Sequence, residues 1–153
     1  MTRSELREHL FRMLFRKEFH NMIELDDQVN LYFQSLRTPI DGLDNLDGSE
    51  EGSAFLKEPD EKEVYYLKDK FNKIIEKLPE IDGIIEQESA GWKLNRMGKI
   101  DLTIMRLATY EIRFDEDIPT GVAINEAVEL AKKFGETQSS SFINGVLAKI
   151  ANI

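Results

Sequence analysis

The chain contains no cysteine, so disulfide bonds and thiol chemistry are excluded. It has only two histidines, His9 and His20, and these are too few and too badly spaced to form a metal site. No stretch approaches the apolar length of a membrane span, and the charged N-terminal segment does not have the pattern of a signal peptide. We therefore expect a cytoplasmic protein that has no membrane association and needs no cofactor.

Basic residues are in the minority. The 153 residues include 29 acidic and 20 basic side chains, which gives a formal net charge of −9. Such a balance argues against a protein that coats nucleic acid by bulk charge, although it does not exclude a local basic patch. Apolar residues make up 41% of the chain, enough to bury the core of one domain.

The hydrophobic periodicity is helical, and no segment alternates as a strand does. It predicts an all-α fold of about seven helices in two small packed bundles. We expect one domain over residues 1–153, with an N-terminal subdomain at 1–78 and a C-terminal subdomain at 79–153. The predicted helices cover about 4–20, 25–36, 60–78, 80–88, 100–114, 120–134 and a last segment that begins near 139–141.

Residues 38–59 lack periodicity and are rich in glycine, proline, serine and acidic residues, so we expect an acidic loop there. A calcium-binding loop is not expected. In the register of an EF-hand, Leu43 and Ala54 would take the first and twelfth ligand positions, and neither can coordinate the ion.

Single residues sharpen the helix predictions. Ser4 is expected to cap the first helix, and one of Ser139 to Ser141 the last. Pro79 should end or kink its helix. Gly135 is expected to end a helix, because it can take the left-handed conformation. Gly145 either allows close helix packing, which is the favoured explanation, or lets a ligand approach. The residues expected to be buried include Leu25, Val29, Tyr32, Leu36, Val122, Leu130 and Val146.

The last third of the chain carries a family resemblance. The segment VAINEAVELAKKFG at 122–135, followed by FINGVLAKIA at 142–151, resembles the C-terminal signature of the NusB transcription antitermination factors. GWKLNRMGKIDLTIMRLATYEI at 91–112 and DIP at 117–119 precede it in the expected order. The resemblance implies a pair of packed helical bundles. It also implies binding of boxA RNA together with NusE, a ribosomal protein of the small subunit, in a complex that joins the elongating RNA polymerase.

The resemblance also implies functional residues. Arg and Lys side chains hold the phosphates of single-stranded RNA, and aromatic rings stack on its bases. Asp101 matches an acidic residue of the family that faces NusE. The basic run before the first helix is thin, and Thr120-Gly121 replaces an aromatic and a basic residue, so we expect RNA binding to be weak or to depend on the partner. The RNA contacts expected by resemblance are Arg3, Arg7, Phe15, Lys132, Lys133, Phe134 and Gln138.

Other interpretations stay open at this point. The arginines of the first helix could be solvated charges, with Arg12 and Arg16 on the surface, and Phe134 is better explained as a core residue. Glu111 lies within an apolar arc, where a structural hydrogen bond is a better explanation than a catalytic base. No nucleophile or second acid accompanies it, so we expect no enzyme. The alternative function is a protein-interaction module or homodimer that has lost RNA binding.

Overall fold

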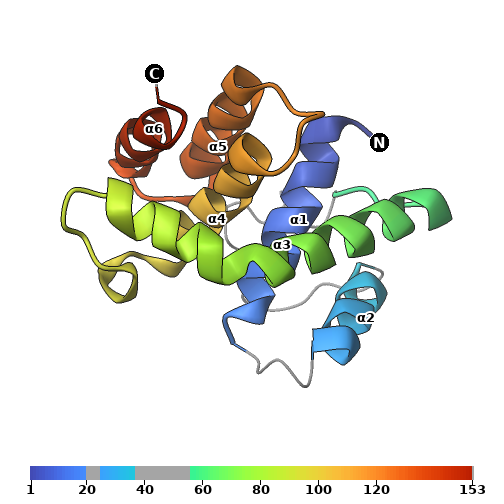
Figure 1. The fold of residues 1–153 in the computed structure, drawn as a ribbon. Coiled ribbons are helices and arrows are strands. Elements are labelled where there is room, and N and C mark those ends of the chain that lie inside the picture. Colours follow the sequence, from blue (N-terminus) through green and yellow to red (C-terminus); the bar gives the residue numbers. More distant parts are fainter. Residues whose placement is uncertain (20–24, 37–55, 153) are drawn as a thin grey trace. The chain divides into compact units, whose positions relative to one another are not determined.

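The computed structural model describes residues 1–19, 25–36 and 56–152, and every regular element in this part of the chain is helical (Figure 1). The predicted all-α fold is therefore confirmed. The acidic segment at 38–59 lies mostly outside the described residues. The elements are α1 (Arg3–Lys17), α2 (Leu25–Ser35), α3 (Glu61–Glu88), the short 3-10 helix η2 (Leu94–Arg96), α4 (Lys99–Arg113), α5 (Thr120–Phe134) and α6 (Ser139–Ile150).

The described residues form six α-helices instead of seven, because α3 continues through Pro79. The expected break at this proline is wrong. Proline removes one backbone hydrogen bond, but the same apolar stripe continues on both sides of it. Ile74, Leu78, Ile81 and Ile85 are all buried, so their burial holds the helix together where the proline weakens it.

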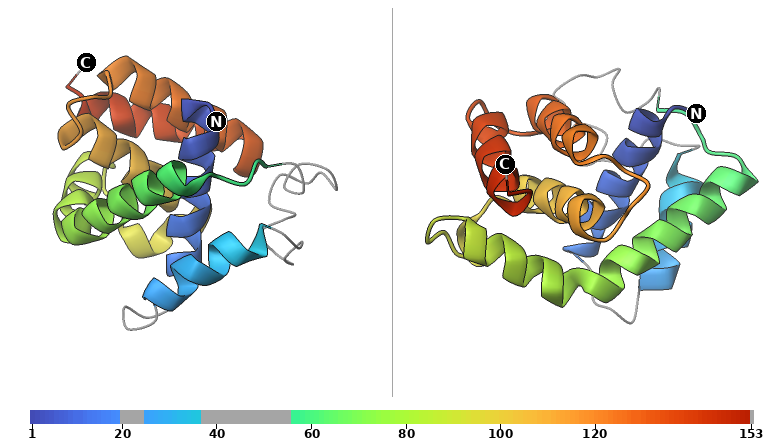
Figure 2. Two further views of the ribbon diagram at one scale, coloured as in Figure 1. Left: turned by 90° about the vertical axis from the view of Figure 1, so that its right-hand side faces the viewer. Right: turned by 45° about the horizontal axis from the view of Figure 1, so that its top comes forward.

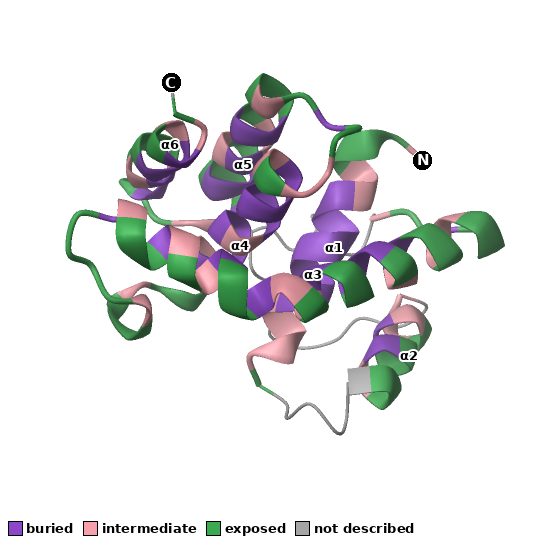
Figure 3. Ribbon diagram, in the orientation of Figure 1, coloured by how far each residue is buried: buried purple, intermediate pink, exposed green. Residues whose placement is uncertain are grey.

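The chain divides into two compact units, Met1–Asn72 and Lys73–Ile153. In the first unit α1 packs against α2, which buries Val29 and Tyr32 as predicted, while Leu36 is only half-buried. The middle of α1 is buried without interruption from residue 7 to residue 14 (Figure 3). An amphipathic helix would instead show an exposed face in each turn.

In the second unit α4, α5 and α6 pack against one another, and both views of Figure 2 show them side by side. The bounds of α5 agree with the predicted helix, and its inward stripe is apolar as expected. Leu130 and Val146 are buried, but Val122 is 42% exposed, so the expectation that it is buried is wrong. Val122 lies in the first turn of α5 beside Ala123, which is fully buried, so Val122 points away from the inward stripe.

Polar contacts join the helices of the second unit. Arg106 of α4 donates two hydrogen bonds to Asp82 of α3, from Nε to Oδ1 at 2.8 Å and from Nη2 to Oδ2 at 2.9 Å. Arg113, at the end of α4, donates from Nε and Nη2 to the carbonyl oxygen of Ile150 at the end of α6, at 3.2 and 3.0 Å. Such paired donors fix the direction of a helix contact as well as its strength.

The glycines and serines near α6 have different roles from those predicted. Gly135 has an extended backbone with φ −89°, not a left-handed one. A Cβ atom there would lie 2.7 Å from Ser139 Cβ and 2.8 Å from the carbonyl oxygen of Ala131, so glycine is needed for space. Gly145 is exposed with nothing within 4 Å of a Cβ position, which rules out the expected close packing. Gln138, not a serine, is the N-cap of α6, and no side chain caps that end.

Candidate functional site

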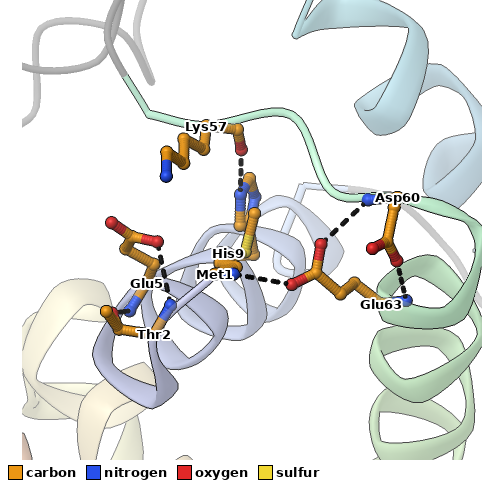
Figure 4. Close-up of polar contacts among 7 residues, drawn as sticks. All are labelled: Met1, Thr2, Glu5, His9, Lys57, Asp60 and Glu63. Carbon is orange, nitrogen blue, oxygen red and sulfur yellow. Dashed lines mark hydrogen bonds and ion pairs between the residues drawn. The ribbon is translucent and has the colours of Figure 1, made fainter.

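The start of α1 is held by a capping box on Thr2, not by the predicted Ser4 (Figure 4). Thr2 Oγ1 accepts a hydrogen bond from the Glu5 backbone at 3.1 Å, and Glu5 Oε2 accepts one from the Thr2 backbone at 3.0 Å. This reciprocal pair satisfies amides at the N-terminus of the helix. Arg3, the first residue of α1, is exposed. Arg7 lies at the same azimuth of α1 as Arg3 but is only 5% exposed. Of these two arginines, therefore, only Arg3 presents its charge to solvent.

The two arginines of α1 that were expected on the surface are not fully exposed. Arg12 is 3% exposed, and its Nη2 atom lies 3.4 Å from Oε2 of the buried Glu8. Arg16 is half-buried, with its guanidinium 5.9 Å from the centroid of the Tyr32 ring. Both side chains are therefore part of the packed structure. A buried charge is tolerated where a partner of opposite charge compensates for lost hydration.

Phe15 belongs to a row of rings along α1. Its ring centroid lies 6.1 Å from that of Phe11 and 5.2 Å from that of Phe19. Phe11 is fully buried, Phe15 is half-buried and Phe19 is 58% exposed. The spacing of four residues places Phe11 and Phe15 on one face of α1, and Phe19 follows the end of that helix. Phe15 therefore presents part of its ring to solvent while the remainder is packed.

His9 connects α1 to the segment that precedes α3 (Figure 4). Its Nε2 atom donates to the carbonyl oxygen of Lys57 at 2.7 Å, and its Nδ1 atom lies 2.6 Å from the Tyr32 hydroxyl. A neutral ring that donates through Nε2 accepts at Nδ1, so the hydroxyl of Tyr32 is the donor. Burial lowers the pKa of His9 below its usual value of 6.5, although the hydrogen bond to Lys57 acts in the opposite direction. His9 is thus a structural residue.

In the second unit, the end of α5 carries two of the expected RNA contacts. Lys132 and Lys133 are both exposed. Lys132 Nζ lies 3.6 Å from Glu129 Oε1, in a solvated pair that contributes little stability. Lys133 Nζ lies 5.3 Å from the centroid of the Phe134 ring. Phe134 itself is only 4% exposed, so its ring belongs to the core and is not open to a base.

Asp101 and Gln138 line the same cleft, which has a volume of about 320 Å³. The cleft lies where α4 and α6 begin, and the N-caps of these helices, Gly98 and Gln138, form no side-chain capping bonds. The sequence predicted Asp101 and Gln138 for different ligands, a protein and an RNA, and gave no sign that they meet. The full lining consists of Trp92, Arg96, Met97, Gly98, Asp101, Glu136, Gln138, Ser139 and Phe142.

The aromatic wall of this cleft was not predicted from the sequence. Trp92 follows a tight turn in which Ala90 and Gly91 have φ values of 52° and 90°, and the indole is 54% exposed. Its centroid lies 6.2 Å from that of Phe142 in an edge-to-face contact. The only signal in the sequence was a single tryptophan directly after a glycine. An exposed indole at a cleft is informative because large aromatic side chains are enriched in binding sites.

Glu111 and the possible metal ligands were the remaining candidates for site chemistry. Glu111 is 1% exposed, as its place in the apolar arc of α4 suggested. Within the described ranges, no three side chains of histidine, aspartate and glutamate lie close enough to hold a metal ion. Among the helices described, none is both long and apolar enough to cross a membrane. The exposed charges and the cleft beside Trp92 are suited to binding macromolecules.

Comparison with known proteins agrees with this fold. The model of the NusB family matches residues 4–152. The chain is 56% identical to the transcription antitermination protein NusB of Lachnoclostridium phytofermentans over 150 residues, covering 98% of both chains. It is 48% identical to the protein of the same name from Agathobacter rectalis, covering 99% of this chain and 100% of the relative.

Solved structures give the same result for the fold. The structure of T. maritima NusB matches with a TM-score of 0.74 and 32% identity, over 99% of this chain and 92% of the other. A chain from the crystal structure of a plectonemic RNA supercoil matches with a TM-score of 0.75 over 98% and 94%, but at 22% identity it shows the fold alone. The family model and the relatives both extend over nearly the whole length, and the chain therefore belongs to the NusB family.

Proposed function

We propose that this chain is an RNA-binding transcription antitermination factor. The observation that carries the proposal is the 56% identity, over nearly the full length of both chains, to a relative named transcription antitermination protein NusB. The proposed ligand is boxA-like single-stranded RNA, bound together with NusE in the cytoplasm. The resulting complex joins the elongating RNA polymerase. The chain acts by assembly and supplies no catalytic group.

The exposed cations are the proposed phosphate contacts. Arg3 supplies one in the first unit, and Lys132 and Lys133 supply two in the second, where Gln138 adds an amide. The half-buried ring of Phe15 is available to a base. Arg7 and Phe134 are buried, so in this proposal they support the neighbouring contacts from within the structure.

The partner contact is proposed at Asp101, which is half-buried in the first turn of α4. A chain with a net charge of −9 repels an RNA strand at long range, and few exposed cations oppose that repulsion. A basic partner bound at an acidic position would reduce it. This is the physical reason to expect that RNA binding depends on NusE.

The test is a gel-shift titration of boxA RNA with the protein, in the absence and presence of NusE. We expect the RNA affinity to rise markedly when NusE is present. Equal affinities in the two titrations would contradict the cooperative part of the proposal, and no binding of either ligand would contradict the function as a whole.

The RNA residues are tested by variants with matched controls. Arg3→Ala and the double variant Lys132→Ala, Lys133→Ala should weaken RNA binding. Each lost phosphate contact should reduce the slope of log affinity against log salt by about one. Lys62→Ala and Lys149→Ala remove exposed lysines elsewhere in the first and second units and should leave the slope unchanged. Equal effects of all these variants would mean that the cations act only through net charge.

A further inference from the structure

We propose that the cleft beside Trp92 binds an arginine side chain of a basic protein partner. The inference rests on the proposed function, because that function supplies a partner at Asp101, but it adds the chemical group that enters and the residues that receive it. These are the indole of Trp92 and the carboxylates of Asp101 and Glu136.

The charge of the lining favours a cation. Two carboxylates, Asp101 and Glu136, and a single guanidinium, Arg96, line the cleft, so its formal charge is −1. Neither carboxylate forms an ion pair with a residue that the structure describes. Carboxylates that line one cleft and are not neutralised attract a positive side chain, and a partly enclosed cleft reduces the screening by water.

The aromatic wall favours arginine over lysine. The indole of Trp92 is 54% exposed and is steadied by its contact with Phe142. A guanidinium is planar and weakly hydrated, so it stacks on an aromatic face while its N–H groups bond to carboxylates. An ammonium group is compact and strongly hydrated, and it makes poorer use of such a wall.

The backbone of the receiving residues is in position before the partner arrives. Asp101 lies in the first turn of α4, and Trp92 follows the turn at Ala90 and Gly91. The backbone of Glu136 is held by its N–H, which donates to Ser139 Oγ at 3.0 Å, while its side chain is exposed. Groups that are already in position lose less conformational freedom on binding, and a larger share of the contact energy then appears as affinity.

A nucleotide of the RNA is the competing occupant. A base could stack on Trp92, but its phosphates would then meet the two carboxylates that oppose a single arginine. Repulsion between like charges in a partly enclosed site disfavours that arrangement. An RNA base stacked on Trp92 in place of a protein side chain is therefore the outcome that would overturn the proposal.

The cleft can be observed directly because Trp92 is the only tryptophan in the chain. Protein labelled with 5-fluorotryptophan gives one fluorine resonance, which reports on the lining of the cleft. We expect NusE to shift this resonance, and the peptide acetyl-Gly-Arg-Gly-amide to shift it at higher concentration. The lysine analogue of the peptide should have a smaller effect. Because the proposed function places RNA at Gln138 in the same lining, boxA RNA alone should shift the resonance less than NusE does.

Variants then test the carboxylates. The double variant Asp101→Asn, Glu136→Gln should lower the affinity for NusE by at least about tenfold while binding of boxA RNA alone does not fall. The matched control Glu86→Gln, Glu116→Gln changes net charge equally at exposed positions of the second unit and should keep the affinity for NusE. Trp92→Phe retains an apolar ring and should bind NusE with an intermediate affinity.

The failure of this inference can be told apart from failure of the proposed function. If NusE and RNA bind but only RNA moves the resonance, or if the double variant binds NusE as the wild type does, the function stands and the arginine cleft is wrong. If neither macromolecule binds, the function fails. The peptide titration then decides the cleft alone, and an unmoved resonance overturns it.

Discussion

Helices α5 and α6 of the second unit and helix α1 of the first unit are buried by different means. In the second unit, α5 and α6 each present an apolar stripe to the core, and their opposite faces are exposed. In the first unit, the buried stretch of α1 includes Arg7, Glu8, His9 and Arg12. Burial of an apolar stripe can be anticipated from periodicity, whereas a buried charge depends on partners from distant parts of the chain. The second unit should therefore respond most to loss of volume, and the first to loss of particular polar contacts.

The largest expected effect is from a cavity in the apolar core of the second unit. Leu147 is fully buried, so Leu147→Ala should lower the free energy of unfolding by about 2–5 kcal/mol. Val122→Ala removes apolar atoms from an exposed position and should change the free energy of unfolding by less than about 0.5 kcal/mol. Urea unfolding followed by circular dichroism measures both. A comparable loss of free energy of unfolding for Val122→Ala would mean that the Val122 side chain is packed.

A smaller effect is expected where the second unit depends on space at a glycine. Gly135→Ala places a Cβ atom against Ser139 and the Ala131 carbonyl, and should lower the free energy of unfolding by about 1–3 kcal/mol. Gly145→Ala, in the open interior of α6, should raise it by about 0.5–1 kcal/mol. Thermal melts of the two variants show whether each substitution raises or lowers the stability. If both variants melt higher, the close approach at Gly135 is relieved by a small shift of Ser139.

The polar core of the first unit can be tested through the pH dependence of the free energy of unfolding, because it contains His9. Its pKa is lowered by burial, so below pH 6.5 the unfolded chain binds a proton that the folded protein does not. The stabilisation is complete above the unfolded pKa and is lost as the pH falls, with a slope of at most about 1.4 kcal/mol per pH unit. Urea titrations between pH 7.5 and 5 should show this fall. The free energy of unfolding of His9→Gln should fall less over this pH range. If the wild type and the variant give parallel curves, the fall is due to other groups.

The smallest effect is expected at the start of α1. Thr2→Ala removes the side chain that caps the helix and should cost about 1 kcal/mol. Ser4→Ala, at the position that the sequence favoured for the cap, should cost less. Both values follow from urea unfolding at pH 7. A larger cost at Ser4 would place the cap where the sequence predicted it.

The same contrast explains which parts of the site could be predicted. Lys132, Lys133 and Gln138 are exposed as expected, because they lie on or beside a regular amphipathic helix. Arg12 was expected on the surface and is buried, because a helical wheel does not show what lies opposite a polar face. Arg3 is exposed and Arg7 is buried although both lie at the same azimuth of α1, and this difference has the same cause.

The cleft beside Trp92 was beyond prediction for a further reason. Its lining comes from the segment before α4, from the first turn of α4, and from the start of α6. None of these segments has a periodic pattern that points to the others. Residues at helix ends meet only when the lengths and directions of the helices are known, and those follow from packing.

The sequence by itself determined the helical class, the bounds of α5 and the apolar stripes of the second unit, because spacing along a helix is a local property that each segment carries alone. The same applies to the resemblance to the NusB family, which is written in contiguous residues. Only the tertiary structure decided that α3 continues through Pro79, that Arg7 and Arg12 are buried, and that Asp101 meets Trp92 and Gln138 in one cleft. These features depend on contacts between segments distant in the chain, and such contacts have no local signature.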